Sequence, residues 1–165
     1  MLFFAIAMLI FWEYYGQDMG MKEMIKDATR VIDGDTIVIS TDGEAQKVRL
    51  KGMDAPELSQ ECSYGDNQQT KYQCGERAAA ELKEMIGSKV LECTDEGNDI
   101  YRRRLAYCYA DGVNINRKMV LDGWAVSYNK EFIPEELIAK TANRGIWRGD
   151  FTMPKDYRKQ CKQRS

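Results

Sequence analysis

The stretch ATRVIDGDTIVISTDGEAQKVRLKGM, residues 28–53, carries two runs typical of β-strands on either side of a turn. Residues 28–40 predict a strand with a kink or bulge at Gly34, because a Gly-Asp pair interrupts an otherwise β-branched run. Residues 41–44, TDGE, predict a turn, and residues 45–53 alternate well enough for a second strand. The two strands are therefore expected to pair as a hairpin.

Short strands and helices follow this hairpin without a regular alternation. In chain order we expect a polar irregular segment at 58–74, a helix at 75–87, strands at 89–94 and 104–109, a helix at 114–122 capped by Asn114, a short strand at 124–128 and a helix at 134–144. A parallel α/β sheet would need strands that alternate with helices. The fold class is therefore mainly β with helices (α+β), as a small antiparallel, five-stranded OB-type barrel with three helices.

The chain of 165 residues, 30 % charged and 44 % apolar, suits one soluble globular domain with a hydrophobic core. We expect four parts along it. They are a signal peptide or membrane anchor at 1–15, a linker at 16–27, an OB-type domain at 28–149 and a basic C-terminal tail at 150–165.

Residues 1–12, MLFFAIAMLIFW, are almost uniformly apolar. The run is shorter than the roughly 20 residues of a spanning helix and matches the roughly 7–15 of a signal-peptide core. Neither a preceding Lys or Arg nor a small-x-small cleavage site is present, so an uncleaved anchor stays open, as does a first core strand or helix. We expect an extracytoplasmic chain that is secreted, periplasmic or membrane-anchored.

The five cysteines include no CxxC pair, which disfavours a zinc site. Export would favour disulfides. Cys62 and Cys74 bracket one loop, and Cys93 and Cys108 lie on consecutive predicted strands. We expect these two pairs, with Cys161 left over, although four cysteines allow three pairings. The alternative is that all are small buried residues of a cytosolic protein.

The chain contains no histidine, which excludes Ser-His-Asp, Cys-His and HExxH chemistry. Any hydrolysis must use carboxylates, arginines, lysines and a hard metal. The net charge of −2 argues weakly against a nucleic-acid partner, but residues 1–100 carry −9 and residues 101–165 carry +7. This distribution suits a metal site beside a phosphate-binding surface, and chance segregation with a solvated tail explains it equally well.

Carboxylates gather around the predicted hairpin. Asp33 and Asp35 flank Gly34, and Asp54 and Glu57 follow the second strand. If a bulge at Gly34 absorbs the difference in length, Asp35 and Asp54 lie at comparable heights. Carboxylate oxygens without histidine or thiolate suit Ca²⁺ or Mg²⁺, although such residues also form ordinary turns.

Arginines accompany these carboxylates. Arg49 lies on the second strand between them, and residues 102–104 form an arginine triplet directly before a predicted strand. Guanidinium groups bind phosphate bidentately and stabilise the charge of phosphoryl transfer. In isolation, the triplet is more typical of a solvated basic loop.

Several motifs together resemble the thermonuclease, or staphylococcal-nuclease-like, family over residues 28–148. They are VIDGDT (31–36), RLKGMDAPE (49–57), YRRRLAYCYADG (101–112) and GWAVSY…AKTANRGIW (123–147). The surroundings of Cys62, CGERAA (74–79) and GIWRGDFTMP (145–154) resemble its exported, cysteine-bearing branch.

The resemblance implies an OB-type barrel and a Ca²⁺-dependent hydrolysis of DNA and RNA. We expect a monomer, tethered to a membrane if residues 1–15 stay uncleaved. By position, the implied ligands are Asp35 and Asp54 with the carbonyl of Ala55, the catalytic residues are Arg49, Glu57 and Arg103, and the nucleotide-side residues are Tyr101 and Tyr128.

Two positions depart from the family pattern. Position 55 is often threonine and is Ala55 here, so a carbonyl ligand survives but a hydroxyl contact does not. Position 102 is usually glycine and is Arg102 here. If that position needs a positive φ, the loop around Arg103 differs, and Arg102 or Arg104 could replace it.

Two other function classes compete with the nuclease. One is a catalytically inactive OB-type module that binds nucleic acid or protein, and the other is a secreted domain whose carboxylates bind Ca²⁺ for stability alone. Copies without catalysis usually lose carboxylates or arginines. The presence of Asp35, Arg49, Asp54, Glu57 and Arg103 together therefore favours the enzyme.

Overall fold

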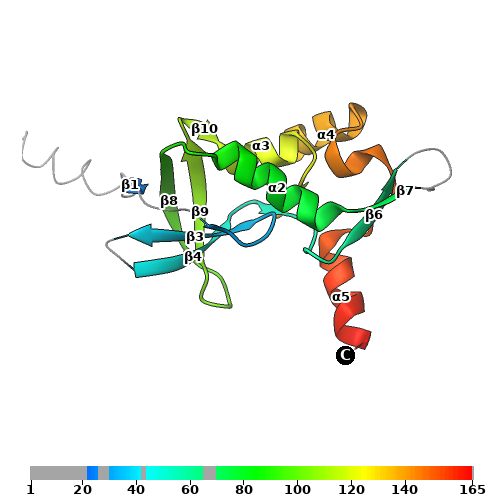
Figure 1. Cartoon of the computed structure of the whole chain (residues 1–165), viewed down its shortest axis with the longest axis horizontal. Coiled ribbons are helices and arrows are strands. Elements are labelled where there is room, and N and C mark those ends of the chain that lie inside the picture. Colours follow the sequence, from blue (N-terminus) through cyan, green and yellow to red (C-terminus); the bar gives the residue numbers. More distant parts are fainter. Residues whose placement is uncertain (1–21, 26–29, 42–43, 65–69, 165) are drawn as a thin grey trace, which may run out of the picture.

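The structure, a computed structural model, describes residues 22–25, 30–41, 44–64 and 70–164 (Figure 1). The predicted signal peptide or anchor at 1–15 and most of the predicted linker lie outside these residues. Among the helices that are described, none is long and apolar enough to cross a membrane.

Seven strands form one curled sheet that makes a partial barrel (Figure 1). In spatial order they are β1 (Lys22–Ile25), β8 (Leu91–Asn98), β9 (Arg104–Ala110), β4 (Glu44–Leu50), β3 (Thr36–Thr41) and β2 (Arg30–Val31), with β10 (Val113–Asn114) also on β9. The mixed α+β, OB-type architecture is confirmed. The purely antiparallel arrangement is wrong in one place, because β4 and β9 pair in parallel.

The β3–β4 hairpin forms as predicted, with an unbroken register from Thr36 opposite Arg49 to Thr41 opposite Glu44. The bulge predicted at Gly34 is absent from this register. The Gly34 backbone instead passes so close to its neighbours that an added Cβ would lie 2.6 Å from the Cβ of Ala55. The difference in strand length is absorbed further on, in the turn at residues 51–52, which leads into β5 (Met53–Asp54).

Four α-helices are described, where three were expected. They are α2 (Cys74–Ile86), α3 (Ile115–Leu121), α4 (Ile133–Thr141) and α5 (Pro154–Arg164), with a short 3₁₀ helix η1 (Gly145–Arg148). The Asn114 side chain accepts the backbone N–H of Arg117, which confirms the predicted cap of α3. The additional helix, α5, lies in the predicted basic tail. It was missed because Pro154 is its only buried residue, so it lacks the apolar face that predicts a helix.

The predicted disulfides, Cys62–Cys74 and Cys93–Cys108, are both present. The first joins α2 to β6 (Glu61–Tyr64), and the second joins β8 to β9. The segment 58–74 was wrongly expected to be irregular, since β6 pairs with β7 (Thr70–Gln73) in a hairpin whose polar residues lack strand alternation. Cys161 is exposed on α5. Two disulfides fit an oxidising compartment.

The hydrophobic core lies between the sheet and the helices, and α2 packs across the sheet (Figure 1). A further short pair, β5 with β11 (Val126–Ser127), lies beside the sheet. This pairing places Tyr128, directly after β11, next to the turn at Gly52, whose carbonyl accepts the N–H of Tyr128 at 2.9 Å. Residues from distant parts of the sequence thus meet at one end of β4.

Candidate active site

One guanidinium bridges two buried aspartates at that end of β4. Arg49 donates through Nη1 to Oδ1 of Asp35 at 2.5 Å and through Nη2 to Oδ1 of Asp54 at 2.8 Å. Asp35 is only 3 % exposed and Asp54 only 2 %. The turn at residues 51–52 brings Asp54 back beside Asp35, so the two carboxylates stand a guanidinium's width apart.

The Asp35 carboxylate accepts hydrogen bonds from three donors, one of which is Arg49. Its Oδ1 also accepts from the Thr36 hydroxyl at 2.9 Å, and its Oδ2 accepts the backbone N–H of Ala55 at 3.1 Å. Burial raises the pKa of Asp35 to about 7, although the contact with Arg49 works in the opposite direction. A cation that binds Asp35 near neutral pH therefore competes with a proton.

Arg158, on α5, reaches the same carboxylates from the far end of the chain. Its Nη1 and Nη2 donate to the two oxygens of Asp54 at 3.0 and 2.8 Å, and Nη1 also donates to Oε1 of Glu57 at 2.8 Å. The hydrogen bonds that Arg158 donates to Asp54 raise the pKa of Arg158 against the effect of its burial. Arg158 thus holds α5 on the candidate site while it neutralises Asp54 and Glu57.

Arg103 lies in the loop between β8 and β9, where Asp99 fixes its position. The Asp99 carboxylate accepts the backbone N–H groups of Tyr101 and Arg103 at 2.9 and 2.8 Å, and the Arg103 Nε at 2.7 Å. The Arg103 guanidinium lies 5.5 Å from the centre of the Tyr101 ring. Arg103 is therefore held by its own loop, and among the described residues no hydrogen bond or ion pair joins it to Asp35 or Asp54.

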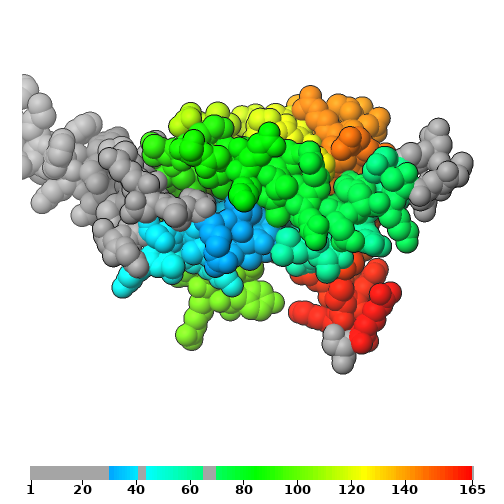
Figure 2. Space-filling view, viewed as in Figure 1, coloured from blue at the N-terminus to red at the C-terminus, as the bar shows by residue number. Residues whose placement is uncertain are grey.

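A cleft of about 990 Å³ runs between this loop and α5. Figure 2 shows the two segments as separate projections, yellow-green and red, with an open notch between them. Seven of the eight predicted metal, catalytic and substrate residues line the cleft: Asp35, Arg49, Ala55, Glu57, Tyr101, Arg103 and Tyr128. The eighth, Asp54, lies behind them in contact with Arg49 and Arg158.

The family is decided by residues 47–149, which match the sequence profile described as Staphylococcal nuclease homologue. The chain belongs to this family. The matched region contains most of the candidate site, and Asp35 and Arg158 lie on either side of it.

Individual relatives agree with this assignment. The chain is 35 % identical to Thermonuclease of Staphylococcus intermedius over 131 residues, 73 % of each chain. It is 32 % identical to Endonuclease YncB of Bacillus subtilis over 130 residues, 72 % of this chain and 59 % of the relative. It is also 34 % identical to Succinoglycan biosynthesis protein ExoI of Rhizobium meliloti over 137 residues, 79 % of this chain and 69 % of the relative.

Although position 102 is an arginine, the loop has the left-handed backbone conformation that glycine favours. Arg102 has φ +60°, in the left-handed region that L-residues rarely adopt. The hydrogen bonds that the Asp99 carboxylate accepts hold the loop in this conformation, so Arg103 keeps its place in the cleft. Arg102 itself does not line this cleft, and neither does Arg104.

We expect Arg102→Gly to stabilise the fold by up to about 1 kcal/mol, because glycine removes the left-handed penalty but loses more chain entropy on folding. Urea unfolding would measure the change. Lys130, with φ +65°, should respond to Lys130→Gly in the same direction. Lys71→Gly, in the extended strand β7, should destabilise instead. If Arg102→Gly lowered the free energy of unfolding, the backbone of Arg102 would not be strained.

Two residues of the site escaped the sequence analysis. Arg158 belongs to no recognised motif and lies 104 residues from Asp54 along the chain. Asp99 left a weak signal, since aspartate at the start of a turn often accepts backbone N–H groups two residues on, as it does here from Tyr101.

The donor chemistry at the site fits a hard cation. Asp35 and Asp54 offer carboxylate oxygens, the ligand type that Ca²⁺ prefers. The two carboxylates are close enough for one guanidinium, that of Arg49, to contact both. Among the described residues, no three acidic, cysteine or histidine side chains gather as a metal cage. Backbone carbonyl or water oxygens would therefore complete the shell, and Arg158 would have to release Asp54.

Proposed function

We propose that the chain is a Ca²⁺-dependent nuclease that hydrolyses phosphodiester bonds in DNA and RNA. The observation that carries this proposal is the Arg49 bridge between Asp35 and Asp54, at the floor of a cleft that Glu57 and Arg103 also line. This supports the proposal because candidate metal ligands, a candidate carboxylate for water and candidate cations for phosphate all line one cavity, with Asp54 directly behind them. Membership of a family that includes a thermonuclease supports it.

Each side chain has a role that its surroundings support. Asp35, Asp54 and the Ala55 carbonyl would hold Ca²⁺, which when bound would draw charge from a phosphate oxygen. Glu57 is 39 % exposed at its side chain, so it can accept a hydrogen bond from the attacking water and orient or deprotonate it.

The arginines would neutralise the negative charge of the phosphate. Arg49 and Arg103 enter the cleft from β4 and from the loop opposite, where they can neutralise the additional charge of five-coordinate phosphorus. Tyr101, 67 % exposed, and Tyr128, 46 % exposed, offer rings and hydroxyls to the nucleotide. We propose an extracytoplasmic location, which the two disulfides support.

Cleavage of labelled single-stranded DNA and RNA by the full chain tests the proposal. We expect products with Ca²⁺, none with excess EGTA, and recovery when Ca²⁺ is restored. Cleavage that persists in EGTA would contradict the metal requirement. Salt-dependent binding without turnover at any Ca²⁺ concentration would instead identify an inactive binding module.

The raised pKa of Asp35 predicts a pH-dependent affinity for Ca²⁺. The ordinary pKa is 3.8 and the value in the fold is about 7, so Ca²⁺ must displace a proton below pH 7. We expect the Kd to rise about tenfold for each pH unit below 7 and to level off above it. Calorimetry in buffers of different ionisation enthalpy should show nearly one proton released per Ca²⁺ at pH 6 and almost none at pH 8.5. Equal release at both pH values would contradict this role of Asp35.

A further inference from the structure

The face of α5 that borders the cleft is entirely basic. All four basic residues of this face line the cleft: Lys155, Arg158, Lys159 and Lys162. Lys155 and Lys162 each lie three or four residues from both Arg158 and Lys159, which places the four on one side of the helix. The carboxylate of α5, Asp156, lies outside this lining. A solvated tail would show no such match between one helix face and one cavity.

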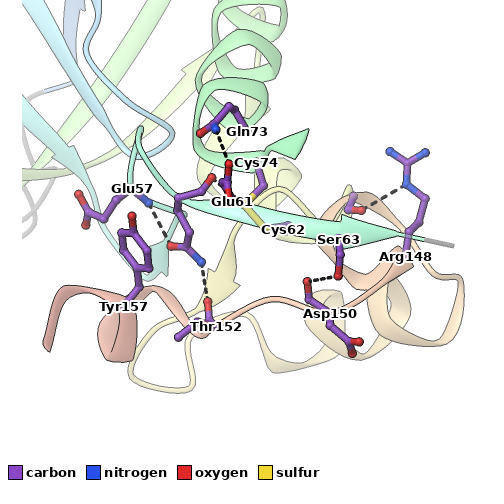
Figure 3. Close-up of a disulfide and its surroundings, with 12 residues drawn as sticks. Glu57, Glu61, Cys62, Ser63, Gln73, Cys74, Arg148, Asp150, Thr152 and Tyr157 are labelled. Carbon is purple, nitrogen blue, oxygen red and sulfur yellow. Dashed lines mark hydrogen bonds between the residues drawn. A yellow bond between two sulfur atoms is a disulfide. The ribbon is translucent and has the colours of Figure 1, made fainter. Parts of the chain in front are cut away.

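Specific contacts hold α5 against the loop that carries Glu57. The Tyr157 hydroxyl donates to the carbonyl of Ser59 at 3.0 Å. The fully buried Gln60 donates through Nε2 to the carbonyl of Thr152 at 2.6 Å, which is the dashed line at Thr152 in Figure 3. The Arg158 ion pairs to Asp54 and Glu57 add a third attachment. The basic face is therefore fixed in position relative to the candidate catalytic centre.

The three lysines of this face have little anionic compensation. Arg158 has two carboxylate partners, whereas Lys159 has only an exposed pair with Asp156 at 3.1 Å. Within the described ranges, no carboxylate pairs with Lys155 or Lys162. An exposed ion pair such as that of Lys159 is weak, so the basic face of α5 presents about three positive charges to the cleft.

We propose that α5 binds the phosphates of the nucleic-acid strand on one side of the bond to be cut, with Lys155, Lys159 and Lys162 as the contacts. Seven residues of helix span about 10 Å, and with the reach of the lysine side chains this length suffices for two or three successive phosphates of one strand. The opposite wall carries the exposed ring of Tyr101, against which an unpaired base can stack. The inference rests on the proposed function only for the identity of the bond that is cut.

The test is the salt dependence of binding without turnover. A fluorescein-labelled 12-nucleotide oligothymidine is titrated with the full chain in EGTA at several KCl concentrations, and anisotropy gives Kd. Each phosphate contact on a single strand contributes about 0.7 to the slope of log K against log salt. The triple variant Lys155→Ala, Lys159→Ala, Lys162→Ala should therefore lose about 2 from the slope and weaken binding about 100-fold at 0.1 M salt.

A matched variant removes three positive charges elsewhere. Lys71→Ala, Lys83→Ala and Lys89→Ala change exposed residues outside α5 that do not line the cleft, so this variant should keep the wild-type slope. Each single lysine variant of α5 should lower the slope by about 0.7, which provides the test if the triple variant folds poorly. A wild type that fails to bind, an unchanged slope in the α5 variants, or an equal loss in the matched variant would overturn the inference.

Cleavage measured separately in Ca²⁺ keeps the two proposals apart. Cleavage by the wild type together with an unchanged slope in the α5 variants would overturn the role of α5 and leave the nuclease proposal standing. A reduced slope in those variants without any cleavage by the wild type would overturn the nuclease proposal and leave α5 as a nucleic-acid-binding wall.

Discussion

Replacement of Glu57 by glutamine is expected to lower the rate constant of phosphodiester cleavage by about 100- to 10,000-fold, the usual contribution of general acid–base catalysis. Glutamine has nearly the shape of glutamate but cannot take a proton from water. The Glu57 side chain is 39 % exposed and its backbone N–H contacts Gln60, so the substitution leaves the loop intact. Single-turnover cleavage of an oligonucleotide at saturating Ca²⁺ would measure the effect.

Controls separate this loss from damage to the fold. The free energy of unfolding of Glu57→Gln should stay within about 0.5 kcal/mol of the wild type. Glu61→Gln changes an exposed glutamate on β6 that hydrogen-bonds Gln73, and it should retain full activity. A Glu57→Gln variant that cleaves at the wild-type rate would remove Glu57 from the mechanism.

The parts of the site that the sequence predicted are those encoded over short distances. The β3–β4 hairpin follows from a local strand–turn–strand pattern, and it alone places Arg49 opposite Thr36, directly after Asp35. Asp54 was predicted beside Asp35 for a partly wrong reason. A turn at residues 51–52, instead of a bulge at Gly34, brings the chain back so that Asp54 lies beside Asp35.

The parts that the sequence could not predict depend on contacts between distant residues. Helix α5 has only one buried residue, so no periodic apolar pattern marks it, and its place is set by Tyr157, Arg158 and the Gln60–Thr152 contact. The conformation at Arg102 is a second example. Its positive φ is stabilised by the hydrogen bonds of Asp99, which no property of an arginine triplet reveals.

Arg49→Met is expected to destabilise the fold by about 1–2 kcal/mol at pH 8, which makes Arg49 a structural residue as well as a candidate catalytic one, because uptake of a proton by Asp35 limits the cost of its unpaired charge. Its guanidinium is the counter-ion that Asp35 and Asp54 share. Asp54 keeps Arg158 when Arg49 is lost, so most of the cost falls on Asp35. Urea unfolding at several pH values would measure it.

The pH dependence identifies Asp35 as the source of this cost. Burial already raises the pKa of Asp35 to about 7 in the wild type, and loss of Arg49 removes the influence that lowers it, so the pKa should rise further. Asp35 then takes up a proton as pH falls, the buried charge disappears, and the destabilisation should be smaller at pH 5 than at pH 8. A cost that is the same at both pH values would contradict this assignment.

A double variant separates the structural role of Arg49 from the catalytic one. Arg49→Met combined with Asp35→Asn removes the unpaired charge together with its counter-ion, so most of the lost stability at pH 8 should return. Cleavage should remain undetectable, because a phosphate-binding cation and a metal ligand are both missing. If the double variant regained stability and activity together, Arg49 would act only as a scaffold for the aspartates, and the charge on phosphorus would have to be neutralised by Arg103 from its loop across the cleft.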